Sequence, residues 1–166
     1  MFDARQLAGY VIESYTKRYG NEISSIKLQK TLYFLFAFWG GFVRKSHEAE
    51  DSVEEIIEEN EILFNNKIEA WVYGPVIPDV YVAFKDGKII RYYSGEEKLF
   101  KDKNPIVKST IDSIMNDIFP ISDFKLVSIS HEDNCWLKRF NIMEEKHHNE
   151  ILKEDIIEEY ATKTLA

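Results

Sequence analysis

Residues 32–39 of the chain read Leu32-Tyr33-Phe34-Leu35-Phe36-Ala37-Phe38-Trp39, a run that is apolar all round a helix. A helix without a polar face belongs in the interior of a fold, where other elements cover every side of it. Ser24 or Ser25 can cap such a helix upstream, and Gly40-Gly41 follows the run. The sequence therefore predicts a central buried helix over residues 26–39, which ends at the two glycines.

Helical periodicity continues on both sides of this central element. Asp3 is an N-cap for residues 4–19, whose apolar positions recur at helical spacing until Gly20-Asn21. The acidic residues 51–61 predict a short, mostly solvated helix. The same spacing predicts helices over residues 78–85, 105–119 and 153–164, and the first two of these begin at a proline. Ser122 caps one more, whose inward positions are Phe124, Leu126, Val127 and Ile129.

Signals for strands are few. Residues 62–64 and 67–72 flank Asn65-Asn66, a pair that tolerates the positive φ of a tight hairpin turn, so they predict a small β-hairpin. Gly74-Pro75 predicts a turn, and residues 87–104 predict an extended or loop segment in which residues 88–93 could form a short strand. The fold class expected is mainly α: a compact single-domain helical fold around a buried central helix, with a small β-hairpin.

Length and composition fit one domain. The chain has 166 residues, of which 45% are hydrophobic and 14% aromatic, enough large side chains for one well-packed core. We therefore expect a single domain over residues 1–166. The lone cysteine, Cys135, excludes an internal disulfide, the amino terminus lacks a signal pattern, and residues 32–43 are too short an apolar run to span a bilayer. These features predict a cytoplasmic protein without a membrane segment.

The net charge of −8 is unevenly spread along the chain. Residues 1–46 hold seven Lys or Arg and three Asp or Glu, whereas residues 47–62 hold eight acidic groups and no Lys or Arg. An acidic chain gains little from the release of phosphate counterions, so nucleic acid is disfavoured as its main partner. The acidic run is either a solvated face or a surface that steers a basic protein partner.

Three segments are distinctive enough for a functional interpretation. The first is Lys27-Leu28-Gln29-Lys30-Thr31-Leu32-Tyr33-Phe34. The second runs from Glu69-Ala70-Trp71-Val72-Tyr73-Gly74-Pro75-Val76 to Tyr81, and the third is Ser130-His131-Glu132-Asp133-Asn134-Cys135-Trp136. From them we take as candidate partner-binding residues Lys27, Gln29, Lys30, Tyr33, Glu69, Trp71, Tyr73, Tyr81, His131 and Trp136.

In order and spacing these segments resemble the Panacea domain of SocA-like antitoxins and of many prophage-encoded proteins. There, a Lys-Leu-Gln-Lys helix precedes a Glu-Ala-Trp-x-Tyr-Gly-Pro-Val segment and a later Thr-His…Pro-Trp segment. The resemblance covers about residues 5–140. Ser130 and Cys135 depart from it, since the family has Thr and Pro at those places.

The resemblance implies an antitoxin that binds a cognate protein toxin encoded by an adjacent gene, or delivers that toxin to a cellular protease. It implies no enzyme activity and no cofactor. It also leaves open a phage-borne protein that antagonises a host defence factor. A third alternative, from the charge pattern, is a DNA-binding regulator that uses the basic residues Arg5, Lys17, Arg18, Lys27 and Lys30.

The candidate residues each have a structural interpretation as well. Lys27 and Lys30 can pair with carboxylates such as Glu69 or belong to a recognition face. The aromatic candidates Tyr33, Trp71, Tyr73 and Tyr81 line either the core or a groove.

The third segment allows a chemical alternative. His131 and Cys135 are four residues apart, which suits a base and a nucleophile on one helix face, although a histidine that fixes a loop by hydrogen bonding is the simpler interpretation. His147-His148 and the nearby glutamates suit a metal or, more simply, a solvated linker. We expect neither a catalytic site nor a metal site.

Overall fold

The computed structural model describes residues 1–48, 60–140 and 148–163. Its elements, in chain order, are α1 (Ala4–Tyr19), α2 (Ser25–Glu48), β1 (Glu69–Trp71), β2 (Gly74–Val76), α3 (Pro78–Lys85), η2 (Ile89–Arg91), α4 (Glu96–Phe100), α5 (Pro105–Ile118), α6 (Asp123–His131), α7 (Asn134–Leu137), β3 (Asn149–Glu150) and α8 (Lys153–Thr162). The expected mainly α fold is confirmed. The predicted helix over residues 51–61 falls almost wholly outside the described residues.

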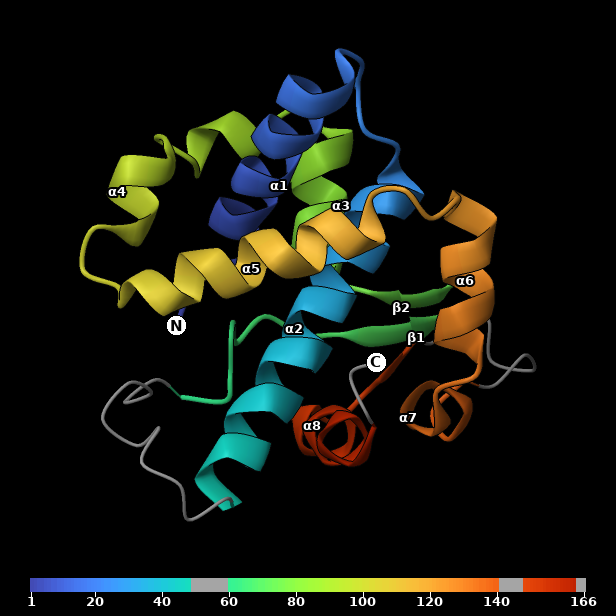
Figure 1. The fold of residues 1–166 in the computed structure, drawn as a ribbon. Coiled ribbons are helices and arrows are strands. Elements are labelled where there is room, and N and C mark those ends of the chain that lie inside the picture. Colours follow the sequence, from blue (N-terminus) through green and yellow to red (C-terminus); the bar gives the residue numbers. More distant parts are fainter. Residues whose placement is uncertain (49–59, 141–147, 164–166) are drawn as a thin grey trace.

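Helix α2 runs through the middle of the molecule, with α1 and α3 beside its first half, α5 crossing it and α8 beside its second half (Figure 1). Leu28, Leu32, Leu35 and Phe36 on this helix are fully buried. The apolar run thus occupies the core because its large side chains meet neighbouring elements on every side.

The prediction that α2 ends at Gly40-Gly41 is wrong, since the helix continues to Glu48. Helix α8 packs closely on this part of α2. A Cβ atom on Gly40 would lie 2.6 Å from Cγ1 of Ile157, and one on Gly41 would lie 2.7 Å from the backbone carbonyl carbon of Tyr160. The two glycines therefore serve the close approach of two helices and not a helix end.

Helix α1 has the predicted bounds. The side chain of Asp3 accepts a hydrogen bond from the backbone N–H of Arg5 at 2.8 Å, and Gly20 ends the helix with φ of 72°. Helices α5 and α8 also begin at the predicted residues, Pro105 and Lys153. Local capping and spacing thus fix these elements.

The predicted β-hairpin has the wrong partner strand and the wrong turn, and the turn predicted at Gly74-Pro75 is also wrong. Strand β1 pairs with β2 through a turn at Val72-Tyr73, and β3 adds to the other edge of β1, so the antiparallel order is β2-β1-β3. Gly74-Pro75 lies within β2. Asn66, predicted as a turn residue, accepts a hydrogen bond from the backbone N–H of Ala4 at 2.9 Å and so ties this segment to α1.

Two further local predictions are wrong. Residues 89–91 form a 3-10 turn and not a strand, and the short helix α4 follows within the segment predicted to be extended. Phe124, predicted to face inward on α6, is 69% exposed. None of the described helices combines the length and the apolar character needed to cross a membrane.

Candidate partner-binding surface

The first turns of α2 hold the β1–β2 hairpin in place. Nζ of Lys30 donates to the carbonyl oxygen of Pro75 at 2.9 Å. The amide of Gln29 brackets Ile77: its Nε2 donates to the Ile77 carbonyl oxygen at 3.3 Å and its Oε1 accepts from the Ile77 N–H at 2.8 Å. Both side chains are buried. The first segment therefore anchors the second.

Lys30 does not pair with Glu69, which was one of the two roles that the sequence allowed it. Burial lowers the pKa of Lys30 to about 7, and within the described part of the chain no carboxylate forms an ion pair with it. Glu69 instead accepts a hydrogen bond from Nε1 of Trp71 at 3.0 Å. The Lys30 ammonium is thus placed by a backbone carbonyl oxygen and is not offered to a partner.

Lys27 is also buried, and it does not belong to a recognition face. Its Nζ donates to the carbonyl oxygens of Phe119, at 3.0 Å, and of Ile121, and lies 3.6 Å from the carboxylate of Asp123. Lys27 therefore fastens α2 to the turn between α5 and α6. With Lys27 and Lys30 buried, the five basic residues singled out in the sequence do not form one exposed basic face.

The third segment also holds the β1–β2 hairpin, through two hydrogen bonds to its backbone. Nε2 of His131 donates to the carbonyl oxygen of Val72 at 3.0 Å, and Nε1 of Trp136 donates to that of Trp71 at 2.9 Å. The rings of His131 and Trp136 stack with 4.2 Å between their centroids and 19° between their planes. His131 thus fixes a loop by hydrogen bonding.

Gly74 lies where the three segments meet. Its φ is +105°, a backbone conformation that residues with a side chain rarely adopt. A Cβ atom on Gly74 would lie 2.4 Å from Oγ of Ser130 and 2.9 Å from Cε of Lys30. One residue from each segment therefore occupies the same small volume. The three segments therefore meet at Gly74.

The tip of the hairpin and the last residue of α7, Leu137, expose apolar side chains. Val72 is 51% exposed, Tyr73 56% and Leu137 52%. We call these three residues, together with the half-buried His131, which contacts Val72 and Trp136, the hairpin-tip surface. Its backbone is held by buried side chains of α2 and by Trp136, so these apolar groups project from a rigid support.

Trp71 of β1 and Tyr81 of α3 pack against each other. Their rings meet edge to face at 5.0 Å, and His148 stacks on Trp71 at 4.2 Å. Trp71 and Tyr81 are half-buried, whereas the candidate Tyr33 is fully buried. His148 packs on an aromatic ring, and its neighbour His147 lies outside the described residues. Among the aromatic candidates Tyr33, Trp71, Tyr73 and Tyr81, Tyr73 is therefore the one whose side chain is exposed.

Beneath the hairpin, Asp133 organises a buried polar cluster that the sequence did not reveal. Its carboxylate accepts hydrogen bonds from the hydroxyls of Tyr33, at 2.5 Å, and Tyr160, at 2.6 Å, and from Nζ of Lys163 at 2.6 Å. Asp133 is only 1% exposed. Its place in the third segment was the one available signal, because its partners are far away in sequence.

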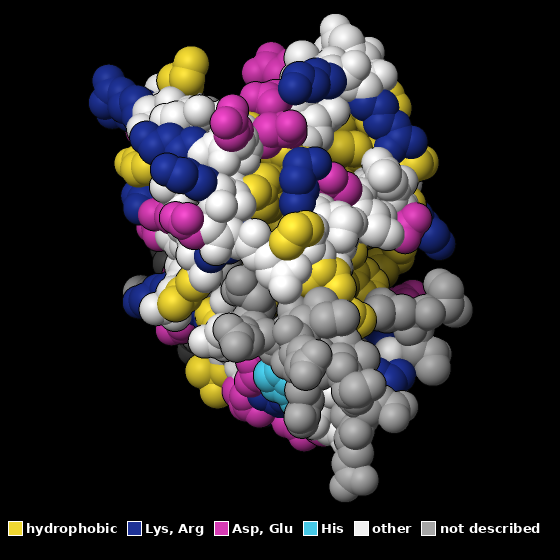
Figure 2. Space-filling view, turned by 60° about the vertical axis from the view of Figure 1, so that its left-hand side comes forward, with side chains coloured by type: hydrophobic (Ala, Val, Ile, Leu, Met, Phe, Trp, Pro, Cys, Tyr) yellow, Lys and Arg dark blue, Asp and Glu magenta, His cyan; other side chains and the backbone are white. Residues whose placement is uncertain are grey.

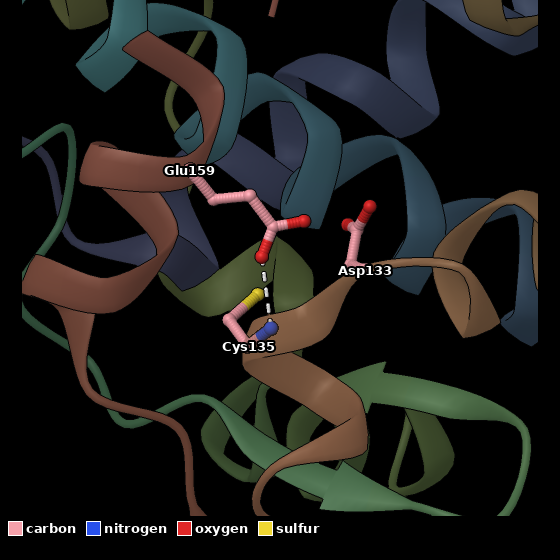
Figure 3. Close-up of side chains that lie close together, drawn as sticks. All are labelled: Asp133, Cys135 and Glu159. Carbon is pink, nitrogen blue, oxygen red and sulfur yellow. Dashed lines mark hydrogen bonds between the residues drawn. The ribbon is translucent and has the colours of Figure 1, made fainter. Parts of the chain in front are cut away.

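Asp133, Cys135 and Glu159 bring three metal-ligand atoms within 4.8 Å of one another (Figure 3). Their carboxylates already have partners in the protein. Glu159 accepts from the backbone N–H groups of Asn134, at 3.1 Å, and Cys135, at 2.8 Å, and Asp133 pairs with Lys163. The trio is best explained as a network that joins α7 to α8.

Cys135 does not have the features of a nucleophile. Its thiol is buried beside the hydroxyl of Tyr33, at 3.4 Å, and burial is the main reason that its pKa rises to about 12. His131 directs Nε2 to the carbonyl oxygen of Val72. The base-and-nucleophile interpretation of these two residues therefore has no support in the geometry.

A family model described as "Antitoxin SocA-like, Panacea domain" matches residues 52–137. The match includes the second and third segments, whereas Lys27, Gln29 and Lys30 precede it. No curated protein and no solved structure is significantly similar to the chain.

Proposed function

Because the chain belongs to the SocA-like Panacea antitoxin family, we propose that it neutralises a protein toxin by direct binding through the hairpin-tip surface. Family membership supports the antitoxin role. The observation that supports this surface is the exposure of Val72, Tyr73 and Leu137 on a hairpin held by buried hydrogen bonds. Rigid aromatic and aliphatic anchors lose little conformational entropy on binding, which makes them effective at interfaces.

The proposed toxin is a basic protein that is encoded by an adjacent gene and that this chain binds in the cytoplasm. The chain carries a net charge of −8, so opposite charge on a partner speeds encounter and favours the correct complex. Lys and Arg side chains nevertheless gather in the upper part of the face in Figure 2, so the acidic character is not uniform. Sequestration and delivery to a protease are two ways in which such a complex neutralises a toxin.

We propose further that the protein acts without catalysis. The support is chemical: a buried thiol whose pKa is about 12 supplies little thiolate at neutral pH. The variant Cys135→Ala should therefore retain full toxin neutralisation. Loss of neutralisation by a folded Cys135→Ala protein would contradict this part of the proposal.

The test combines growth rescue with co-purification. The adjacent gene is induced with and without this protein, and the pair is then purified. We expect growth rescue and a stable complex. Tyr73→Ser and Leu137→Ser should each lower the affinity of this complex at least about tenfold, a loss of roughly 1.4 kcal/mol of binding free energy, because each removes an exposed apolar anchor. Rescue with loss of the toxin from the cell would indicate delivery to a protease.

The matched control is Ile90→Ser. Ile90 is 81% exposed on η2, outside the hairpin-tip surface, so this substitution removes the same kind of side chain from a different place. Binding should be unchanged. If all three variants weaken the complex equally, or if none does, the hairpin tip is not the binding surface. If the adjacent gene's product is neither toxic nor bound, the antitoxin proposal itself fails.

A further inference from the structure

A groove of about 690 Å³ lies between α2, α5 and α6, and none of the residues of the hairpin-tip surface lines it. Buried Phe34, Ile118 and Leu126 contribute to its apolar lining. Half-buried aromatic and aliphatic side chains form its walls, namely Phe38, Phe42, Ile114, Ile121 and Ile129. None of the functions discussed above uses this groove.

The shape of the groove fits an α-helix. Phe34, Phe38 and Phe42 follow one another at four-residue spacing on α2, so they line about 12 Å of the groove at a rise of 1.5 Å per residue. A helix that binds in such a groove inserts apolar side chains spaced three or four residues apart. The α5 rim carries the short side chains of Ser109, Thr110 and Ser113, which leave room for a helix backbone.

The negative charge at the groove favours a helix that carries basic side chains. Asp117 is the one charged residue among those that line it, and it is exposed. In the described parts of the chain no Lys, Arg or His forms an ion pair with its carboxylate. The net charge of the chain, −8, acts in the same direction at longer range. A Lys or Arg at the edge of an apolar helix face would complement Asp117.

We propose that this groove is a second docking site, which takes an amphipathic helix of a protein partner whose apolar face is flanked by Lys or Arg. The site is separate from the hairpin-tip surface.

The test uses two synthetic peptides and needs no knowledge of the partner. One is a helical peptide with a Leu/Ile face flanked by lysines; the other has glutamates in place of the lysines. Binding to the full chain is measured by calorimetry at low and at physiological salt. The cationic peptide should bind at least about tenfold more tightly. Equal binding of the two peptides, or no binding of either, would overturn the proposal.

A charge reversal tests the role of Asp117. Asp117→Lys should weaken the cationic peptide at least about tenfold and improve the acidic one. Glu158→Lys is the matched control, because it makes the same change in net charge at an exposed residue of α8 outside the groove. If both variants weaken the cationic peptide equally, attraction is non-specific and the proposed site is wrong.

A steric block tests the groove itself. Ser113 is exposed on its rim, so Ser113→Trp fills the groove without altering the core, whereas Ser128→Trp adds the same side chain to α6 outside the groove. Only Ser113→Trp should abolish binding of the cationic peptide. Self-association that is lost in Ser113→Trp would identify a second copy of the chain as the occupant and overturn the proposal. Because Tyr73→Ser leaves the groove intact, peptide binding should survive it even if the hairpin-tip proposal fails.

Discussion

The ammonium group of Lys30 donates a hydrogen bond to the carbonyl oxygen of Pro75 at 2.9 Å, across 45 residues of sequence. Lys30 is 1% exposed, and its side chain lies against Gly74 of the hairpin. A lysine in this setting is a costly way to hold a strand, because burial disfavours its charged form. That cost makes stability depend on pH in a way that can be measured.

Lys30→Met tests this dependence. The native pKa of Lys30 is about 7, below its ordinary value of 10.5, so between these values the unfolded chain binds more protons than the native one. The free energy of unfolding of the natural protein should therefore rise from pH 7 towards pH 8.5 relative to Lys30→Met, with a limiting slope of about 1.4 kcal/mol per pH unit. Urea denaturation at four pH values measures both slopes, and parallel slopes would contradict the prediction.

Gly74→Ala should be more harmful than Gly95→Ala. The two glycines have nearly the same φ, 105° and 104°, so both substitutions carry a similar backbone penalty. Only at Gly74 does the new Cβ meet Ser130 and Lys30, whereas Gly95 has nothing within 4 Å. Overpacking should lower the free energy of unfolding of Gly74→Ala by about 1–3 kcal/mol more than that of Gly95→Ala. Equal losses would mean that the hairpin can move away from α2 and α6 without cost.

Gly41→Ala should destabilise the protein although alanine favours helices. In an open helix, replacing Gly by Ala adds about 1 kcal/mol of stability. At Gly41 the Cβ would lie 2.7 Å from the backbone carbonyl carbon of Tyr160, and backbone cannot rotate away as a side chain can. We expect a loss of about 1–3 kcal/mol in thermal or urea unfolding. Thr16→Ala, at an exposed position of α1, should raise the free energy of unfolding, because alanine has the higher helix propensity. A rise for Gly41→Ala as well would contradict the tight contact between α2 and α8.

A double-mutant cycle on Asp133 and Lys163 should reveal strong coupling. Removing one charge takes away the closest ionic partner of the other, at 2.6 Å, although Lys163 keeps Glu159 at 3.3 Å. Because the Asp133 carboxylate is buried, Asp133→Asn should cost about 3 kcal/mol of unfolding free energy. The coupling with Lys163→Met should exceed 1 kcal/mol. The surface pair Lys138–Asp155, at 3.3 Å, is the control and should show coupling below about 1 kcal/mol. Equal coupling in both cycles would contradict the role assigned to Asp133.

The thiol of Cys135 should react slowly in the native protein. Its pKa is about 12 and the side chain is buried, whereas in the unfolded chain the pKa returns to about 9. Alkylation by iodoacetamide at pH 8, followed by mass spectrometry, should be at least about a hundredfold slower without urea than in urea. Comparable rates would show that α7 opens readily from α8.

How far the sequence predicted the fold depends on how local each signal is. Helix α1 was predicted with its observed bounds because Asp3, the apolar spacing and Gly20 all lie within one short stretch. The strand pairing was not predicted, because β3 lies about 80 residues after β1 in the sequence and the residues around Asn65-Asn66 suit a turn equally well. The two contacts of Asn66, with Ala4 and Asp79, decided against that turn.

The candidate residues divide in the same way. The three segments were correctly singled out as belonging together, and the sequence by itself determined that family and the central place of α2. The roles of single residues were decided only by tertiary structure. Lys30 differs from a surface lysine because β2 and α6 close over it, and Gly41 differs from a helix end because α8 lies against it. Caps and periodicity are properties of neighbouring residues, whereas burial and close approach are created by segments that meet only when the chain is folded.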